Sequence, residues 1–238
     1  MSQIFRFKQF NLNQEGCAMK MGTDAMLLGA LAQPHNAQNI LDIGTGTGVL
    51  SLMLAQRCPD AIIDAVEIDP TAAKCAKENF ENSSWDYKLT LYNEPLQDYT
   101  NIDVILYEYI VCNPPYFEPS PTTRPDRINA RTTVTLDHET LIHYADKLLG
   151  ANGTLGLILP EQECERVINI AAQKNLQTKR QVYIRSYADG LVIRRVMEFC
   201  REKNLQQQQE HLYIYNEDKT WSNEYQLLTQ DFHYIETR

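Results

Sequence analysis

The sequence predicts an α/β protein whose core is a doubly wound, mostly parallel sheet of seven strands with helices on both faces. Two observations predict this fold. Short apolar strands alternate with helical segments from residue 39 to about 160, and a glycine-rich turn follows the first strand. We expect an N-terminal arm over residues 1–38, the sheet domain over 39–203 and a β-containing tail over 204–238 that packs on the domain.

The first half of the domain is expected to contain three strands and two helices. Asp69 and Pro70 mark the start of the second helix, because Asp is a favoured N-cap and Pro is favoured in the first helical turn. Apolar residues then recur at helical spacing as far as Phe80. In chain order we expect strand 39–43, helix 49–57, strand 61–67, helix 71–82 and strand 87–92.

The second half continues the alternation and ends in a β-hairpin. The fourth strand lies in the later part of residues 103–112, and Gly150 is expected to end the helix that follows it. A turn at residues 188–190 joins two β-rich runs, which makes one edge of the sheet antiparallel. In chain order we expect strand 109–112, helix 137–149, strand 154–159, helix 160–174 and strands 181–186 and 191–201.

Composition places the chain among globular cytoplasmic proteins. Of its 238 residues, 43% are hydrophobic and 22% are charged, and no apolar run approaches the roughly 20 residues that span a bilayer. The first residues lack the apolar core of a signal peptide. The six cysteines are dispersed without a C-x-x-C pair, so we expect reduced core thiols and neither disulfides nor a metal site.

The net charge of −9 argues against a nucleic-acid partner unless basic residues gather locally. Such a gathering occurs over residues 174–195, where six lysines and arginines accompany one aspartate. Two interpretations stay open for this segment. It forms either a positive face that contacts phosphates or an ordinary solvated surface.

The first strand ends in a turn that suits a bound cofactor. Its glycines, Gly44, Gly46 and Gly48, let the backbone turn sharply and approach a ligand closely, just before a helix N-terminus. Glu67 ends the second strand about 20 residues later, where an acid can accept hydrogen bonds from ribose hydroxyls. Together with Asp42, these residues predict an adenosine-containing cofactor. The glycine spacing is not G-x-G-x-x-G, which argues against a nicotinamide-dependent dehydrogenase.

These two segments, D-I-G-T-G-T-G at 42–48 and V-E-I-D-P at 66–70, resemble motifs I and II of the class I S-adenosylmethionine-dependent methyltransferases, whose fold is Rossmann-like. The resemblance implies that the glycines pass under the methionine portion of S-adenosyl-L-methionine, that Asp42 orients the loop, and that Glu67 binds the ribose. Members of this family often place an Asp after the third strand to hold the adenine amino group. In this sequence Glu94 or Asn93 stands there.

Asn113-Pro114-Pro115-Tyr116 follows the fourth strand and resembles the N/D-P-P-Y/F motif of methyltransferases that act on planar amino nitrogens. The lone pair of such a nitrogen is delocalised, which makes it a poor nucleophile. The Asn113 side chain and the Pro114 carbonyl can accept its two N–H bonds and so support the charge that develops during attack. Tyr116 offers a ring face on which the target base can stack. The motif fits adenine N6, cytosine N4 and a glutamine amide alike.

The N-terminal arm indicates which of these three target groups is methylated. Its segment M-K-M-G-T-D-A-M-L-L-G-A at 19–30 resembles the corresponding segment of the bacterial tRNA(Val) adenine-37 N6-methyltransferases. The resemblance implies a tRNA substrate and a helix whose first residues, Thr23 and Asp24, contact the methionine end of the cofactor. A plain helix cap is the alternative role for both residues. Other functions that stay open are N5-methylation of a glutamine amide in a translation factor, N6-methylation of adenine in rRNA or DNA, and non-catalytic nucleic-acid binding.

An RNA substrate requires basic residues that can meet its phosphates despite the acidic net charge. One candidate group lies on the Pro-rich loop after N-P-P-Y-F, and loops of this kind often carry binding residues. The other group lies on the predicted hairpin. The candidates are Arg124, Arg127 and Arg131 on the loop, and Arg194 and Arg195 on the hairpin.

Overall fold

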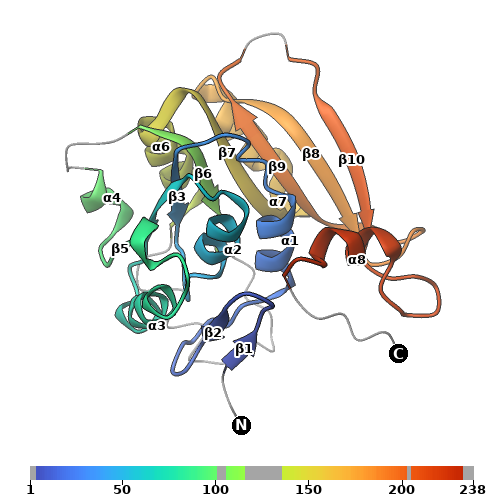
Figure 1. The fold of residues 1–238 in the computed structure, drawn as a ribbon. Helices are drawn as coiled ribbons and strands as arrows, with labels where there is room; N and C mark the ends of the chain where they lie inside the picture. The colour runs from blue at the N-terminus through green and yellow to red at the C-terminus, as the bar shows by residue number, and fades with distance from the viewer. Residues whose placement is uncertain (1–3, 101–105, 116–135, 203–204, 233–238) are drawn as a thin grey trace.

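The structure is a computed structural model, and it describes residues 4–100, 106–115, 136–202 and 205–232. Its core is an eight-stranded sheet in the order β10-β8-β9-β7-β6-β3-β4-β5 (Figure 1). The strands of this sheet are β3 (Asn39–Ile43), β4 (Ile62–Val66), β5 (Leu89–Tyr92), β6 (Tyr107–Cys112), β7 (Leu149–Pro160), β8 (Gln177–Arg185), β9 (Val192–Cys200) and β10 (Gln208–Tyr213). A separate antiparallel pair, β1 (Ile4–Arg6) and β2 (Asn11–Asn13), precedes it.

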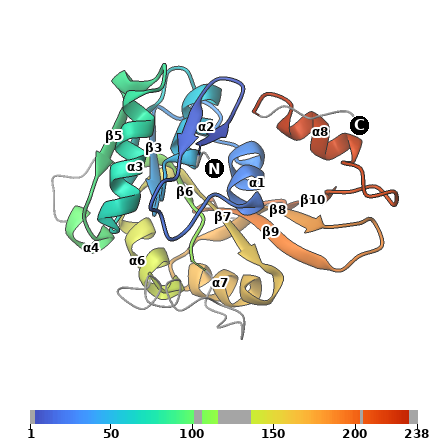
Figure 2. The same cartoon turned by 90° about the horizontal axis from the view of Figure 1, so that it is seen from below.

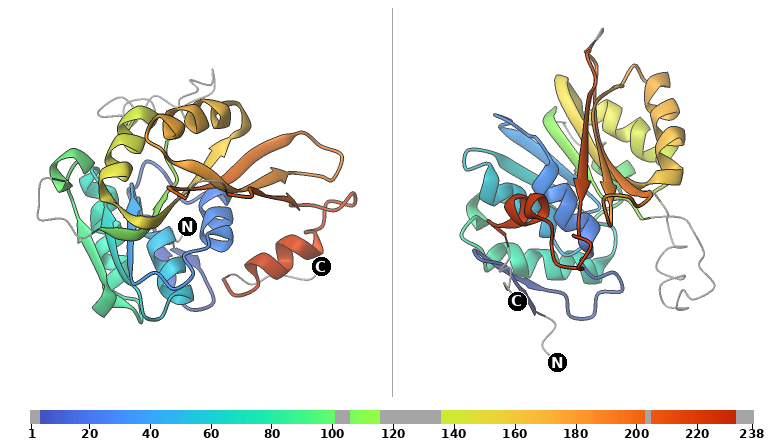
Figure 3. Two further views of the ribbon diagram at one scale, coloured as in Figure 1. Left: turned by 90° about the horizontal axis from the view of Figure 1, so that it is seen from above. Right: turned by 90° about the vertical axis from the view of Figure 1, so that its right-hand side faces the viewer.

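Helices cover both faces of the sheet, as Figures 2 and 3 show from three directions. The α-helices are α1 (Thr23–Leu31), α2 (Val49–Arg57), α3 (Pro70–Glu81), α4 (Leu96–Tyr99), α6 (His138–Leu148), α7 (Glu161–Gln173) and α8 (Asn223–Thr229). Two apolar cores follow from this arrangement. One core holds buried residues of α1, α2, α3 and α8, and the other holds buried residues of α4, α6 and α7. The predicted doubly wound α/β fold is confirmed.

The strand directions place the carboxyl ends of most strands at one edge of the sheet. β5, β4, β3, β6 and β7 are mutually parallel, and β9 runs antiparallel to β7. β8 is antiparallel to β9, and therefore runs in the same direction as β7. The tail strand β10 pairs in parallel with β8, so the sheet has eight strands and not the predicted seven. Leu212 of β10 is buried, and its burial accounts for the docking of the tail.

One predicted helix end has the expected chemistry, and another departs from it. The Asp69 carboxylate accepts hydrogen bonds of 2.8 Å from the amides of Thr71 and Ala72, which caps α3 ahead of Pro70. Gly150 does not end α6 as predicted. The helix stops at Leu148, and the buried Leu149 already has the extended backbone of β7, so no left-handed residue is needed.

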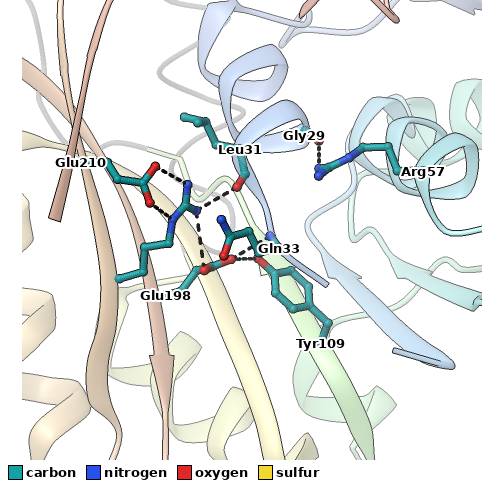
Figure 4. A network of polar contacts seen from close by, with 8 residues as sticks. Gly29, Leu31, Gln33, Arg57, Tyr109, Glu198 and Glu210 are labelled. Atoms are coloured by element: carbon teal, nitrogen blue, oxygen red, sulfur yellow. Dashed lines mark hydrogen bonds and ion pairs between the residues drawn. The ribbon is translucent and has the colours of Figure 1, made fainter. Parts of the chain in front are cut away.

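A buried ion-pair network fixes the arm and the tail to the sheet (Figure 4). Arg180 of β8 is 3% exposed and donates to the Leu31 carbonyl at 2.9 Å and to Glu210 of β10 at 2.6 and 3.0 Å. Its guanidinium also lies 3.6 Å from Glu198, which accepts a hydrogen bond of 2.7 Å from Tyr109. Burial of a charge is tolerable only with such partners, which explains why this arginine is not on the surface.

All six cysteines are buried, as expected of core thiols. Within the part of the chain that the structure describes, no helix is long and apolar enough to cross a membrane.

Candidate active site

A cavity lies at the carboxyl edge of the sheet, where several loops meet. Six segments of the chain line it. Such convergence at the strand ends of a doubly wound sheet is the usual position of a ligand site. The lining residues include Ala18 and Met19 of the arm, Gly44 and Gly46 after β3, Glu67 after β4, Glu94 after β5, and Asn113, Pro114 and Pro115 after β6.

The glycine turn after β3 divides into two parts with different roles. Gly44 and Gly46 line the cavity with φ of +69° and +60°, and a Cβ at either position would meet no protein atom within 4 Å. Gly48 does not line the cavity. It has φ +86° at the N-cap of α2, and a Cβ there would lie 2.5 Å from the Phe80 ring. The cofactor contact predicted for the three glycines stays a prediction, and of the three only Gly44 and Gly46 border the cavity, while Gly48 allows α2 to approach α3.

Asp42 lies behind this turn and holds it in shape. The residue is fully buried, and its Oδ2 accepts hydrogen bonds from the Thr45 hydroxyl at 2.6 Å, the Ser51 amide at 3.1 Å and the Ser51 hydroxyl at 2.7 Å. Burial raises the pKa of its carboxyl from 3.8 to about 6, although these hydrogen bonds oppose the shift. The contacts match the loop-orienting role predicted for Asp42, and they place it outside the cavity lining.

This shift has a measurable consequence for folding. Because the folded protein holds the Asp42 proton more tightly than the unfolded chain does, ionisation of Asp42 between about pH 4 and pH 6 lowers the free energy of unfolding. We expect the free energy of unfolding of wild type to fall, relative to that of Asp42→Asn, by up to about 3 kcal/mol from pH 4 to pH 7. Urea denaturation of both proteins at the two pH values measures the difference. Parallel pH dependences would contradict the assignment.

Glu67 bridges the glycine turn and the start of α3. Its Oε2 accepts a hydrogen bond of 2.8 Å from the Gly46 amide, and its Oε1 accepts one of 2.8 Å from the Asp69 amide. Burial raises the pKa of this carboxyl, and the backbone hydrogen bonds oppose the rise. Each carboxylate oxygen has capacity for another hydrogen bond, so Glu67 can also accept from ribose hydroxyls at the cavity wall.

The two candidates for the adenine amino group are distinguished by their contacts. The Asn93 side-chain amide donates to the backbone carbonyl of Glu67 at 2.8 Å, and Asn93 is exposed. Glu94 lines the cavity, and its buried Oε1 has no hydrogen-bond partner among the residues that the structure describes. A buried acceptor without a partner is costly, and a donor from a bound ligand would satisfy it. This contrast favours Glu94.

Asn113, Pro114 and Pro115 follow β6 directly and line the cavity. They lie beside the glycine turn after β3, because β6 is the neighbour of β3 in the sheet. The pairing of Ile43 with Cys112 brings the two strand ends level. The residues expected to perform chemistry and those expected to hold the cofactor thus border one cavity. Tyr116, the fourth residue of the motif, lies outside the described residues.

Comparison with known proteins agrees with this geometry. Residues 18–182, more than half of the chain, match the methyltransferase small domain family. The chain belongs to this family.

Two bacterial relatives match almost the whole length of the chain. Both are named tRNA1(Val) (adenine(37)-N6)-methyltransferase. The relative from Pectobacterium carotovorum is 39% identical over 96% of this chain and 93% of its own. The relative from Parabacteroides distasonis is 38% identical over 96% of this chain and 97% of its own. A crystal structure of a predicted O-methyltransferase from Agrobacterium tumefaciens has a TM-score of 0.70 at 16% identity, over 90% of this chain and all of that one, and shows the shared fold.

The arm of this methyltransferase-family chain meets the cavity at residues other than those predicted. Ala18 and Met19 line the cavity, whereas Thr23 and Asp24 do not. Gly22 is the N-cap of α1, with no side-chain cap bond, so the alternative role as a helix cap fails as well. The Asp24 carboxylate instead accepts hydrogen bonds of 3.0 and 3.1 Å from Nε of Arg194.

The hairpin arginines of the chain serve internal contacts. Arg194 binds Asp24, as described above, and its side chain is 30% exposed. Arg195 is 8% exposed, and it binds Glu161 and Glu165 of α7 as well as Gln181. Arg195 therefore lies inside the protein and not on the RNA-contacting surface that its sequence position suggested. The loop arginines Arg124, Arg127 and Arg131 lie outside the described residues.

Proposed function

We propose that this protein transfers a methyl group from S-adenosyl-L-methionine to N6 of adenine 37 in tRNA(Val). One observation carries the proposal. Asn113, Pro114 and Pro115 line the same cavity as Gly46 and Glu67, so the parts expected to hold an amino nitrogen and a cofactor lie together. The nucleotide and the tRNA come from the names of relatives that match almost the whole chain.

The cavity has the features that S-adenosyl-L-methionine needs. At Gly44 and Gly46 a Cβ would enter open space, which leaves room for a ligand against the backbone. Glu67 supplies a carboxylate for the ribose, and the unpartnered Oε1 of Glu94 supplies an acceptor for the adenine amino group. When bound, this cofactor supplies an electrophilic methyl group on its sulfur.

Asn113 and Pro114 act on the substrate nitrogen. The Asn113 side-chain oxygen and the Pro114 carbonyl oxygen each accept one of the two N–H bonds of the adenine amino group, which fixes the direction of its lone pair. As the nitrogen forms its new bond to carbon, it gains positive charge, and both oxygens stabilise that charge. The proline ring restricts the backbone at Pro114 and so keeps its carbonyl in place. The nitrogen then loses one proton to solvent.

Transfer of a labelled methyl group tests the proposal against its alternatives. Purified protein should label a tRNA(Val) transcript and not a translation factor, rRNA or DNA, and nucleoside mass spectrometry should identify N6-methyladenosine at position 37. Labelling of a protein instead would assign the glutamine-amide reaction. Binding of S-adenosyl-L-methionine without transfer to any of these would leave only a binding function. The buried free cysteines agree with the proposed cytoplasmic location.

The assignment of Glu94 predicts a selective loss of cofactor affinity. Glu94→Ala should weaken binding of S-adenosyl-L-methionine about 10-fold, the scale of one hydrogen bond to a charged group. Calorimetry measures this, with Asp98→Ala of the exposed α4 face as the matched control. Since Oε1 has no partner in the free protein, the variant should lose no stability without cofactor. Unchanged affinity, or a loss of stability in the free protein, would remove Glu94 from the site.

A further inference from the structure

The turn between β8 and β9 projects from the same edge of the sheet as the cavity. β8 runs in the direction of β6 and β7, so its carboxyl end and residues 186–191 lie at that edge. Figure 2 looks onto this edge, and the hairpin turn lies at its right beside α8. Three strand spacings, roughly 14 Å, separate β8 from β6, and the turn extends about five residues, roughly 17 Å, beyond the level of Asn113 along the strands. One RNA molecule that reaches Asn113 can therefore also reach this turn.

The turn exposes apolar side chains. Leu191 is 88% exposed, more than any other large hydrophobic side chain in the described residues, and Ile193 is 37% exposed. We name Leu191 and Ile193 the apolar tip. Single exposed apolar residues are common on protein surfaces, but Leu191 at the end of the turn and Ile193 two residues later in β9 expose apolar surface close together.

Hydrogen bonds and aromatic contacts hold the turn that carries the apolar tip in place. The Gly190 amide donates to the Tyr187 carbonyl at 3.0 Å, and the Tyr215 amide donates to the Ser186 carbonyl at 2.9 Å. The Tyr187 ring lies 5.8 Å from that of Tyr215, which stacks at 4.8 Å on the Trp221 ring, and this in turn stacks at 4.7 Å on the buried Tyr225 ring. A surface fixed in this way loses little conformational entropy when it binds a partner.

The formal charges of Arg194, Asp24, Arg185 and Asp189 around the apolar tip sum to zero. Arg194 binds Asp24, and Nη1 of Arg185 lies 2.9 Å from Nδ1 of His211. Asp189 in the turn adds a negative charge. Phosphate groups therefore gain little at this surface, whereas the uncharged faces of unpaired bases can pack against its apolar side chains.

We propose that the apolar tip holds unpaired bases of the RNA substrate next to the target adenine. The inference rests on the proposed function. An adenine whose amino group enters a cavity must leave its base stack, and this exposes the faces of neighbouring bases. The apolar tip covers such faces without requiring positive charge, which suits an acidic protein. It thus selects a substrate by its unpaired loop.

The double variant Leu191→Ser/Ile193→Ser tests this inference on a tRNA(Val) transcript. We expect KM for the transcript to rise about 10-fold, the scale of losing the burial of one apolar side chain. The value of kcat at saturating transcript and the affinity for S-adenosyl-L-methionine should stay unchanged. The salt dependence of transcript binding should also keep its slope, because no phosphate contact is removed. Ile62→Ser is the matched control, since Ile62 is 55% exposed at the amino end of β4, on the opposite edge.

Each other outcome overturns the inference in a distinguishable way. An unchanged KM in an active double variant rejects the contact. A smaller salt slope would assign the apolar tip to phosphates. An unchanged KM with a shift from dimer to monomer in sedimentation would assign it to a second copy of the chain. If wild type itself transfers no methyl group to the transcript, the proposed function fails and this inference fails with it.

Discussion

Replacement of Asn113 by alanine is expected to lower kcat for tRNA methylation by about 100- to 1000-fold, the scale seen when one oriented transition-state partner is removed. Asn113 lines the cavity at the carboxyl end of β6, level with the glycine turn after β3. Its side-chain oxygen would accept one N–H bond of the target nitrogen, and this contact strengthens as the nitrogen becomes positive. Single-turnover assays at saturating cofactor and tRNA measure the chemical step directly.

Two controls separate chemistry from structure in this experiment. Cofactor affinity, measured by calorimetry, should change little in Asn113→Ala, because the ribose and adenine contacts are assigned to Glu67 and Glu94. Asn113→Asp keeps an acceptor oxygen at the same place, and it should retain more activity than the alanine variant. Near-normal turnover of Asn113→Ala would reject the role proposed for this residue. Equal losses in both variants would reject the acceptor as its cause.

The sequence predicted those parts of the site that depend on strand ends. Asp42 stands just before the carboxyl end of a parallel strand, and Glu67 and Asn113 each follow such an end directly. The carboxyl ends of the parallel strands of one doubly wound sheet meet at one edge. A local pattern was therefore enough to bring together residues that are far apart in the chain.

Contacts between distant segments could not be predicted in this way. Arg194 and Asp24 are 170 residues apart, and Arg195 and Glu161 are 34 apart. In the sequence, both arginines belong to a basic run that resembles a phosphate-binding surface. Only the pairing of β9 with β7 and the packing of the arm place a carboxylate beside each of them. The charge of a segment therefore does not predict which of its side chains are exposed when carboxylates from other elements pair with them.

The three glycines after β3 also differ in contacts that the sequence alone does not predict. All three have positive φ, so each needs the left-handed conformation that glycine adopts at least cost. Their backbone conformation alone therefore does not distinguish their roles. Their surroundings differ, because Gly46 faces an open cavity while Gly48 faces the Phe80 ring. This difference leads to opposite expectations for two neighbouring substitutions.

Gly46→Val is expected to weaken binding of S-adenosyl-L-methionine by about 100-fold or more, about 2.7 kcal/mol, while the protein still folds. A Cβ at this position meets no protein atom within 4 Å, so the added side chain occupies the space proposed for the ligand. The left-handed backbone, with φ +60°, adds a strain of about 1–2 kcal/mol, which lowers stability without preventing folding. Calorimetry with S-adenosyl-L-methionine and urea denaturation of the free protein measure the two effects separately.

Gly48→Ala is the matched comparison, and it should lower the stability of the protein more than its affinity for the cofactor. Its Cβ would lie 2.5 Å from Cε1 of Phe80, a buried ring of α3, so α2 or α3 must shift. We expect a loss of stability of about 1–3 kcal/mol from overpacking, in addition to the backbone strain. Any protein that folds should bind the cofactor more tightly than Gly46→Val does, since Gly48 does not line the cavity. Equal affinities in the two variants would show that the cofactor does not lie against Gly46, and the cavity would then need a different occupant.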